Sequence, residues 1–319
     1  MSFGERHLVD PDLFPARLAG EPWGPATLVV DVAGGPYVFR DLTPPQATLL
    51  RRRYDGFARP ETAPPPVGGV ECRAFRVAEH EFHRFRLAGL ELTFERDYEE
   101  RAVRLAGIDV MARIELRDDG MQAALWTSNG DPEHFHGALE NVFRVLVAYR
   151  VLALGGVLLH SAGIVPGSTA QAAAIICCGP SGTGKSTLSR LALAAGQQVA
   201  SDDLNALLPG GASFEFQPLP FAGDVRPAAW DAGARPLAAV CRLVQGTEEA
   251  VTPLGAAAAA ASLVACAPYV NADPHRGDRL LAVLDRLLHS IPAYRLTFAL
   301  DGRAPRLLES IVRQDPPPR

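Results

Sequence analysis

The stretch that decides the fold reads Gly179-Pro180-Ser181-Gly182-Thr183-Gly184-Lys185-Ser186-Thr187. It matches the pattern G-x-x-x-x-G-K-[ST] in full and directly follows the apolar run 172–178. Its three glycines let the chain curl, so that successive backbone N–H groups point into one anion-sized hollow. The sequence therefore predicts a strand, a phosphate loop and a helix in direct succession.

Two side chains of this loop carry the expected chemistry. Lys185 places a mobile charge where it reaches the β- and γ-phosphates of a nucleotide, and the Ser186 hydroxyl is placed to ligate Mg²⁺. The helix that follows is expected to stop at Gly196 and to add the positive end of its dipole to the site. We therefore expect ATP and Mg²⁺ as cofactors; the alternative is a glycine-rich turn without a ligand.

Composition limits the class of protein. The chain has 319 residues, 48% of them hydrophobic and 21% charged, which is enough for two domains with ample cores. A net charge of −5 without a long basic run argues against a nucleic-acid partner. Five cysteines without paired spacing favour a reducing compartment, and Cys177 and Cys178 are expected to be packing residues. With no secretory signal and no long apolar span, the sequence predicts a cytoplasmic protein without a membrane partner.

The first half has the pattern of a strand-rich α+β domain. Strands are expected at 26–32 and 36–40, joined as a hairpin at Gly34-Gly35, with a helix over 46–54. The stretch 59–69 is rich in proline and glycine and predicts an irregular connection.

Further along, the stretches 82–87, 90–96 and 108–116 alternate in polarity, which is typical of an antiparallel sheet. An amphipathic helix is expected from Pro132 to about Leu154. We place the domain boundary near residue 135, so that residues 1–135 form an N-terminal domain for acceptor recognition and residues 136–319 form the catalytic domain.

The second half brings further polar residues toward the loop. The expected strand 155–165 carries His160, and an antiparallel neighbour would bring this imidazole toward the phosphate site. The strand 199–203 ends in Asp202 and Asp203, and we expect it beside the loop strand with both carboxylates at its C-terminal end. The alternatives are a hydrogen-bonded core histidine and an aspartate pair used for ion pairs or helix capping.

Three segments in this order and spacing, 159–163, 179–187 and 201–203, resemble the kinase domain of the HPr serine kinase/phosphorylase family, particularly its relatives in bacterial biosynthetic clusters. The resemblance covers about residues 150–300. It implies an α/β fold: a mixed-sheet P-loop kinase core shared with ATP-dependent phosphoenolpyruvate carboxykinase. It also implies transfer of the γ-phosphoryl group of ATP to a hydroxyl, either a serine of a peptide or protein or a small molecule. The first half has no such resemblance.

The resemblance implies a role for each matching residue. Lys185 would neutralise the transferring phosphoryl group, Ser186 would hold Mg²⁺, and Asp202 would accept the proton of the attacking hydroxyl. His160 would orient or support that site, and Asp203 would lie on the metal side. Such a set suits phosphoryl transfer, which needs charge neutralisation, in-line positioning and a base.

Two weaker signals follow the aspartate pair. The segment 223–227 partly echoes an acidic-Val/Ile-Arg-Gly signature of that family, which would make Asp224 a metal-side carboxylate and Arg226 a basic catalytic residue; the alternative is a surface turn. Arg276 and Arg279 are expected in a solvated loop, the alternative being a late-positioned arginine of the site. The phosphorylase element is not recognisable, so a one-way kinase is expected.

Two other functional classes stay open at this point. One is a nucleotide-hydrolysing switch, which needs a water-positioning residue and segments that respond to the γ-phosphate. The other is a binding module that senses ATP without chemistry, against which the intact Lys185, Ser186 and Asp202 argue. The identity of the acceptor and the formation of a homo-oligomer are not set by the sequence.

Overall fold

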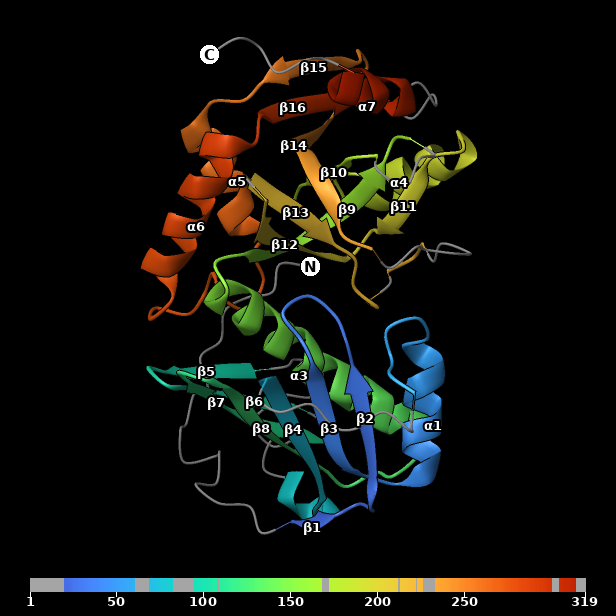
Figure 1. The fold of residues 1–319 in the computed structure, drawn as a ribbon, viewed down its shortest axis with the longest axis vertical. Coiled ribbons are helices and arrows are strands. Elements are labelled where there is room, and N and C mark those ends of the chain that lie inside the picture. Colours follow the sequence, from blue (N-terminus) through green and yellow to red (C-terminus); the bar gives the residue numbers. More distant parts are fainter. Residues whose placement is uncertain are drawn as a thin grey trace. The chain divides into compact units, whose positions relative to one another are not determined.

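The computed structural model describes residues 20–60, 69–82, 95–107, 109–167, 172–211, 213–221, 223–225, 233–299 and 304–313. Over these residues the chain is a mixed α/β protein with two eight-stranded sheets and six α-helices (Figure 1). It divides into two compact units, residues 1–150 and 151–319, and each unit holds one sheet. The division falls near the end of a long helix, whereas the sequence analysis placed the boundary at its start.

The sheet of the first unit has the strand order β2-β3-β4-β8-β7-β6-β5, with β1 also paired to β4. The strands are β1 (Glu21–Pro22), β2 (Ala26–Val30), β3 (Tyr37–Leu42), β4 (Gly69–Arg76), β5 (Glu95–Glu99), β6 (Ala102–Gly107), β7 (Val110–Arg117) and β8 (Gly120–Thr127). The expected β2–β3 hairpin is confirmed. Strand β7, which covers most of the expected stretch 108–116, pairs antiparallel with β6 and β8, in agreement with the expected antiparallel sheet. Strand β5 also pairs antiparallel with β6. However, β4 pairs in parallel with both β3 and β8, so the sheet is mixed. Residues 83–94, which hold most of the expected stretches 82–87 and 90–96, and residues 61–68 of the expected connection 59–69 lie outside the described residues.

Helices α1 (Pro44–Arg53) and α3 (Pro132–Ala153) accompany this sheet, with a short 3₁₀ turn at Glu79–Phe82. Helix α1 begins two residues before the expected start, because Thr43 and Gln46 cap each other's backbone N–H groups. In α3, the ring of Phe143 packs edge-on against Tyr37 and Phe39, at centroid distances of 5.1 and 4.9 Å. These aromatic contacts explain why most of α3 belongs to the first unit.

A buried carboxylate ties the end of β8 to the start of α3. Asp109 is 5% exposed and accepts hydrogen bonds from Thr127 Oγ1 (2.8 Å), Ser128 N (2.7 Å), Ser128 Oγ and Asn129 N (3.1 Å), and its Oδ2 lies 2.8 Å from His134 Nε2. Burial disfavours ionisation of Asp109, but the hydrogen bonds from Ser128 and its neighbours outweigh it and lower the pKa. The charged carboxylate therefore stabilises this turn.

We predict that Asp109→Asn lowers the free energy of unfolding by about 2–3 kcal/mol, because an amide nitrogen cannot accept and leaves buried donors unpaired. The pKa of Asp109 in the folded state lies below its unfolded value of about 3.9. The carboxylate therefore contributes its full stabilising free energy above that pH and loses this stabilisation as the pH falls through the folded-state pKa. The difference between variant and wild type should shrink as the pH falls below about 4 in urea titrations. Asp118→Asn, at a 97% exposed side chain, is the matched control. Equal stability of both variants would contradict the assignment.

The sheet of the second unit has the order β10-β9-β12-β13-β14-β16-β15, and β11 pairs with β9. Because β10 also pairs with β14, the strands β10, β9, β12, β13 and β14 form a closed ring of hydrogen-bonded neighbours. The strands are β9 (Val157–Val165), β10 (Ala174–Cys178), β11 (Gln198–Ser201), β12 (Leu204–Gly210), β13 (Ser213–Gln217), β14 (Arg235–Gln245), β15 (Ala250–Pro253) and β16 (Ala293–Phe298).

Four helices belong to the second unit: α4 (Lys185–Ala194), α5 (Ala256–Ala265), α6 (Gly277–Ser290) and α7 (Ala304–Arg313). Helices α4 and α7 share one core cluster with β10, β14 and β16, in which Leu188 of α4 and Leu308 of α7 are fully buried. This packing fixes the direction in which α4 leaves β10. Among the described helices, none combines the length and apolarity needed to cross a membrane.

Candidate functional site

The site forms around the middle of β9, which pairs antiparallel with β10 on one side and with β11 and β12 on the other. Ser161 is opposite Cys178, the last residue before the phosphate loop, and His160 is opposite Leu204. The expectation that β11 lies beside the loop strand is wrong. Strand β9 lies between them, because it serves as the antiparallel partner of both.

The phosphate loop has the conformation that its glycines permit. Gly182 and Gly184 have φ angles of 82° and 97°, in the left-handed region that favours glycine. A Cβ atom on Gly184 would lie 2.7 Å from Cζ of Phe298, so the ring of β16 closes off this side of the loop. Two hydrogen bonds stabilise the loop. Thr183 Oγ1 donates to the carbonyl oxygen of Pro180 (2.8 Å), and Gln245 Nε2 donates to the carbonyl oxygen of Gly182 (2.9 Å).

The start of α4 presents backbone donors. Its first helical bond runs from Leu188 N to the carbonyl oxygen of Gly184 (2.8 Å), so the N–H groups of residues 185–187 have no acceptor within the helix. The N-cap Gly184 provides no side-chain acceptor. Ser186 and Thr187 are half-buried and Ser181 is exposed. Such a helix N-terminus after a glycine-rich loop is suited to bind an anion.

Lys185 lies in this loop with its ammonium group bound to the backbone. The side chain is buried, and Nζ donates to the carbonyl oxygens of Gly179 (2.8 Å) and Pro180 (3.2 Å). Burial lowers the pKa of Lys185, and the nearby Cys266, Cys178, Asp203 and Asp202 oppose this effect. Lys185 is therefore close enough to the aspartate pair to interact with it electrostatically.

Asp202 lies at the break between β11 and β12 and is 4% exposed. Its Oδ1 accepts a hydrogen bond from Val225 N (3.2 Å), while its buried Oδ2 has no hydrogen-bond partner among the residues that the structure describes. A Cβ atom on Gly223 would lie 2.6 Å from Oδ1, so the chain approaches the carboxylate closely there. Burying a carboxylate oxygen without a hydrogen-bond donor costs free energy. This oxygen is therefore suited to accept a hydrogen bond from a ligand.

Asp203 points to a different partner. Its Oδ1 lies 3.1 Å from His160 Nδ1, and its backbone is held by bonds from Ser161 N to its carbonyl oxygen (2.9 Å) and from its N–H to Ser201 Oγ (3.0 Å). The His160 side chain is 44% exposed, which rules out the alternative of a packed core histidine. The register of β9 thus brings His160 and Asp203 together beside Lys185 and Asp202.

Of the weaker signals, Asp224 and Arg279 do not join this group. The Asp224 side chain is 69% exposed and pairs with Arg190 at 3.5 Å, and Arg226 lies outside the described residues. Arg279 Nε donates to the carbonyl oxygen of Leu152 (3.0 Å) at the end of α3, so the alternative of a late-positioned arginine is wrong for it. Among the described residues no cluster of three or more His, Cys, Asp or Glu side chains is arranged to hold a metal ion.

Cys266, the C-cap residue of α5, is a site residue that the sequence analysis missed. Its carbonyl oxygen accepts the N–H of His160 (2.7 Å), which places the end of α5 beside the middle of β9. The neighbouring Cys178 thiol lowers the pKa of Cys266 to about 7; burial opposes this, and Gly179 and Lys185 support it. No motif marks this cysteine, because it lies about eighty positions beyond the loop.

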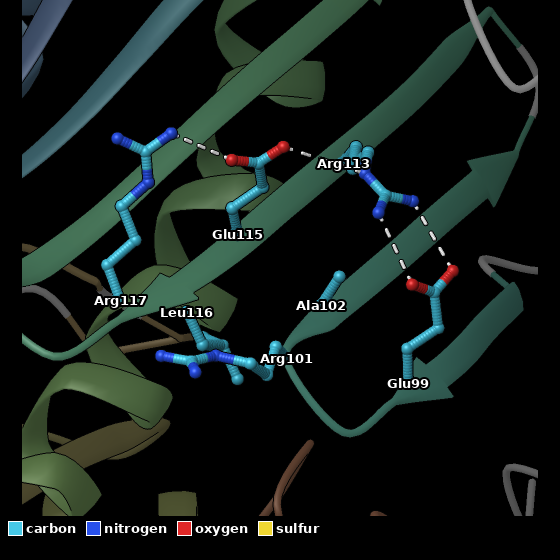
Figure 2. A pocket seen from close by; sticks show the side chains of 7 residues that line it. All are labelled: Glu99, Arg101, Ala102, Arg113, Glu115, Leu116 and Arg117. Atoms are coloured by element: carbon cyan, nitrogen blue, oxygen red, sulfur yellow. Dashed lines mark hydrogen bonds and ion pairs between the residues drawn. The ribbon is translucent and has the colours of Figure 1, made fainter.

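A hollow lies on the first unit, over strands β5 to β7 (Figure 2). Its volume is about 340 Å³, and its lining consists of Glu99, Arg101, Ala102, Arg113, Glu115, Leu116 and Arg117. Arg113 faces Glu99 with two 3.3 Å contacts, and Arg117 pairs with Glu115 at 2.9 Å, as Figure 2 shows. None of these residues was predicted as a site residue.

Comparison with known families decides the relationship of the chain. The family model described as "ScmC: SynChlorMet cassette protein ScmC" matches residues 138–313, more than half of the chain. The chain belongs to the ScmC family. The match runs from α3 into α7 and contains the whole phosphate-loop site. No curated protein matches the chain significantly.

The expected membership in the HPr serine kinase/phosphorylase family is therefore wrong, since the model that matches is ScmC and no kinase family model does. The error has a physical origin. The three segments that carried the resemblance are short, and a phosphate loop with carboxylates on a neighbouring strand satisfies a chemical need that many nucleotide sites share. The ScmC match also includes the helices and strands between those segments.

We predict that Gly184→Ala destabilises the protein more than Gly182→Ala. Both variants force a side chain into the left-handed region, at a cost of roughly 1–2 kcal/mol, but only Gly184→Ala also meets Phe298. Thermal melts of the two variants, each with and without Phe298→Leu, test this assignment. Phe298→Leu should recover part of the stability lost in Gly184→Ala and none of the stability lost in Gly182→Ala. An equal loss in both glycine variants would mean that the ring of Phe298 does not close off the loop.

Proposed function

We propose that the second unit of this ScmC protein is a P-loop phosphotransferase core, which binds Mg-ATP and transfers the γ-phosphoryl group to a hydroxyl. The observation that carries the proposal is the buried Oδ2 of Asp202, which has no hydrogen-bond partner among the described residues and whose charge acts on Lys185. An ATP sensor without chemistry has no use for a costly buried carboxylate at this place. A substrate hydroxyl supplies the missing donor.

In this mechanism the backbone N–H groups of residues 185–187 bind phosphate oxygens at the positive end of α4. Lys185 leaves the carbonyl oxygens of Gly179 and Pro180 and neutralises charge on the transferring group. Asp202 accepts the proton of the attacking hydroxyl as its oxygen bonds to phosphorus and the bond to ADP breaks. His160, held by Asp203, orients the hydroxyl from the exposed side.

The residues present fit Mg²⁺, an ion that takes few protein ligands and keeps phosphate oxygens and water around it. Ser186 at the first turn of α4 and the Asp203 carboxylate are the hard oxygen donors that would hold it. When bound, Mg²⁺ neutralises charge on the β- and γ-phosphates. Asp224 is not part of this donor set, because its carboxylate pairs with Arg190.

The acceptor is proposed to be a serine hydroxyl of a peptide or protein, with a small-molecule hydroxyl as the alternative. We assign its recognition to the first unit. This unit offers the charged hollow of Figure 2, in which Arg113 and Arg117 pair with Glu99 and Glu115. A polar acceptor can replace these ion pairs with its own contacts. The site is proposed to operate in the cytoplasm.

We predict that Lys185→Ala removes most of the stabilisation by Mg-ATP. For wild type, a ligand at a hundred times its dissociation constant stabilises by about 2.7 kcal/mol, and the variant should lose the larger part of this in thermal melts. The matched control is Arg190→Ala, since Arg190 lies on the same helix with its charge turned to Asp224. Equal ATP affinity of wild type and Lys185→Ala by calorimetry would refute the phosphate site.

We predict that Asp202→Asn keeps Mg-ATP affinity within about threefold and lowers phosphoryl transfer by about 10²–10⁴-fold, the range for loss of a general base. Because the acceptor is not identified, water serves as a surrogate acceptor, and phosphate release is measured in single turnovers. Asp224→Asn, at an exposed carboxylate, is the control and should keep the wild-type rate. A wild-type rate in Asp202→Asn would remove the assignment of the base.

A further inference from the structure

Two arginines lie side by side in the sheet of the second unit, next to the strand that leads into the phosphate loop. Strand β14 runs parallel to β10, with Arg242 opposite Cys178, the last residue before the loop. Strand β16 runs parallel to β14, with Arg295 opposite Arg242. Because neighbouring strands are about 4.8 Å apart, Arg242 is one strand and Arg295 two strands from the start of the loop.

Both side chains leave the sheet on the face opposite α4 and α7. The residues that follow them in their strands, Leu243 and Leu296, belong to the core cluster shared with α4 and α7. Successive side chains of a strand point to opposite faces, so Arg242 and Arg295 share the other face, and both are exposed. They are therefore accessible to a ligand.

The positive charges of this pair are not balanced within the part of the chain that the structure describes. No ion pair joins Arg242 or Arg295 to a carboxylate there. Their outer neighbours in the same row are Cys178 on β10 and Thr252 on β15, and neither carries a negative charge. Like charges at neighbouring positions of two strands repel each other. An anion bound between the two guanidinium groups would remove this repulsion.

The strand order places this pair and the proposed base on opposite sides of the loop strand. Hydrogen-bonded neighbours follow in the order β11, β9, β10, β14 and β16, and Asp202 comes directly after β11. The N–H of Ser161 bonds to the carbonyl oxygen of Asp203, and Ser161 is itself opposite Cys178. The aspartates, the start of the loop and Arg242 therefore form one row across the sheet, with the loop in the middle.

Phosphoryl transfer gives this row a direction. The attacking oxygen, the phosphorus and the leaving oxygen lie roughly in line during the reaction. With the attacking hydroxyl at Asp202, the leaving ADP extends from the γ-phosphate away from β11 and toward β14. The α-phosphate then comes to the side of the loop on which the two arginines lie. A guanidinium group suits it, because its planar N–H groups form charge-assisted hydrogen bonds with two phosphate oxygens.

We propose that Arg242 and Arg295 bind the α-phosphate of the nucleotide and hold the leaving ADP on the side of the loop opposite Asp202. The proposal rests on the proposed phosphotransferase function, and it adds a phosphate contact that the loop motif does not contain. It implies that a triphosphate chain reaches the arginines, whereas pyrophosphate, which fills only the loop, does not.

The experiment measures the affinity of the full chain for the Mg²⁺ complexes of ATP, tripolyphosphate and pyrophosphate by calorimetry. Arg242→Gln and Arg295→Gln should each weaken binding of ATP and tripolyphosphate by roughly tenfold to a hundredfold, the range for a lost hydrogen bond to a charged group. Pyrophosphate affinity should stay within about threefold, because the helix N-terminus binds it without the arginines. Arg190→Gln, at an exposed arginine of α4 that pairs with Asp224, is the matched control and should keep all three affinities.

Thermal melts without ligand separate binding from a structural role. Each variant removes one of two charges that repel each other, so neither should melt earlier than wild type. A variant that melts earlier and still binds ATP as wild type does would show a structural role and overturn the proposal.

The remaining outcomes separate this proposal from the proposed function. Variants that keep wild-type affinity for ATP and tripolyphosphate would overturn the proposal and leave the phosphotransferase function intact. A loss for ATP alone would place the arginines at the nucleoside, and an equal loss for pyrophosphate would place them at the loop; either result would overturn the α-phosphate assignment. A wild-type chain that binds neither ATP nor tripolyphosphate would refute the proposed function, and the arginine site with it.

Discussion

The antiparallel pairing of β9 with β10 is the constraint on which the candidate site depends. It places Ser161 opposite Cys178 and therefore sets His160 level with the first residue of the phosphate loop. On its other edge β9 pairs with β11 and β12, and the break between these two strands places Asp202 and Asp203 in the same region. A shift of one residue in β9 would turn His160 to the other face of the sheet and separate it from Asp203.

The site combines two kinds of polar group that have no hydrogen-bond partner among the described residues and that a ligand can pair. The start of α4 has backbone donors without helical acceptors, and Asp202 has a buried acceptor oxygen without a donor among the described residues. Burial of both kinds costs free energy, which a protein retains at functional sites. Lys185, between them, is held by the carbonyl oxygens of its own loop and can exchange these for phosphate oxygens. The pattern favours a charged substrate with a hydroxyl next to it.

Much of this could be predicted from local sequence. The phosphate loop, α4, the β2–β3 hairpin and the extent of α3 each depend on residues within a few positions, through glycine, capping and amphipathic spacing. The position of β11 and the role of Cys266 depend instead on pairings between distant strands and helices, which no local pattern contains. The family was also misassigned for this reason, because three short motifs describe the chemistry of a phosphate site and not the elements that connect them.

A crystal structure with Mg²⁺ and a non-hydrolysable ATP analogue would decide whether the loop between β10 and α4 binds a triphosphate opposite Asp202. We expect the β- and γ-phosphates on the N–H groups of residues 182–187, with Lys185 Nζ moved from the carbonyl oxygen of Pro180 to a phosphate oxygen and Asp202 facing the γ-phosphate. A triphosphate bound elsewhere, or a γ-phosphate turned away from Asp202, would contradict this expectation.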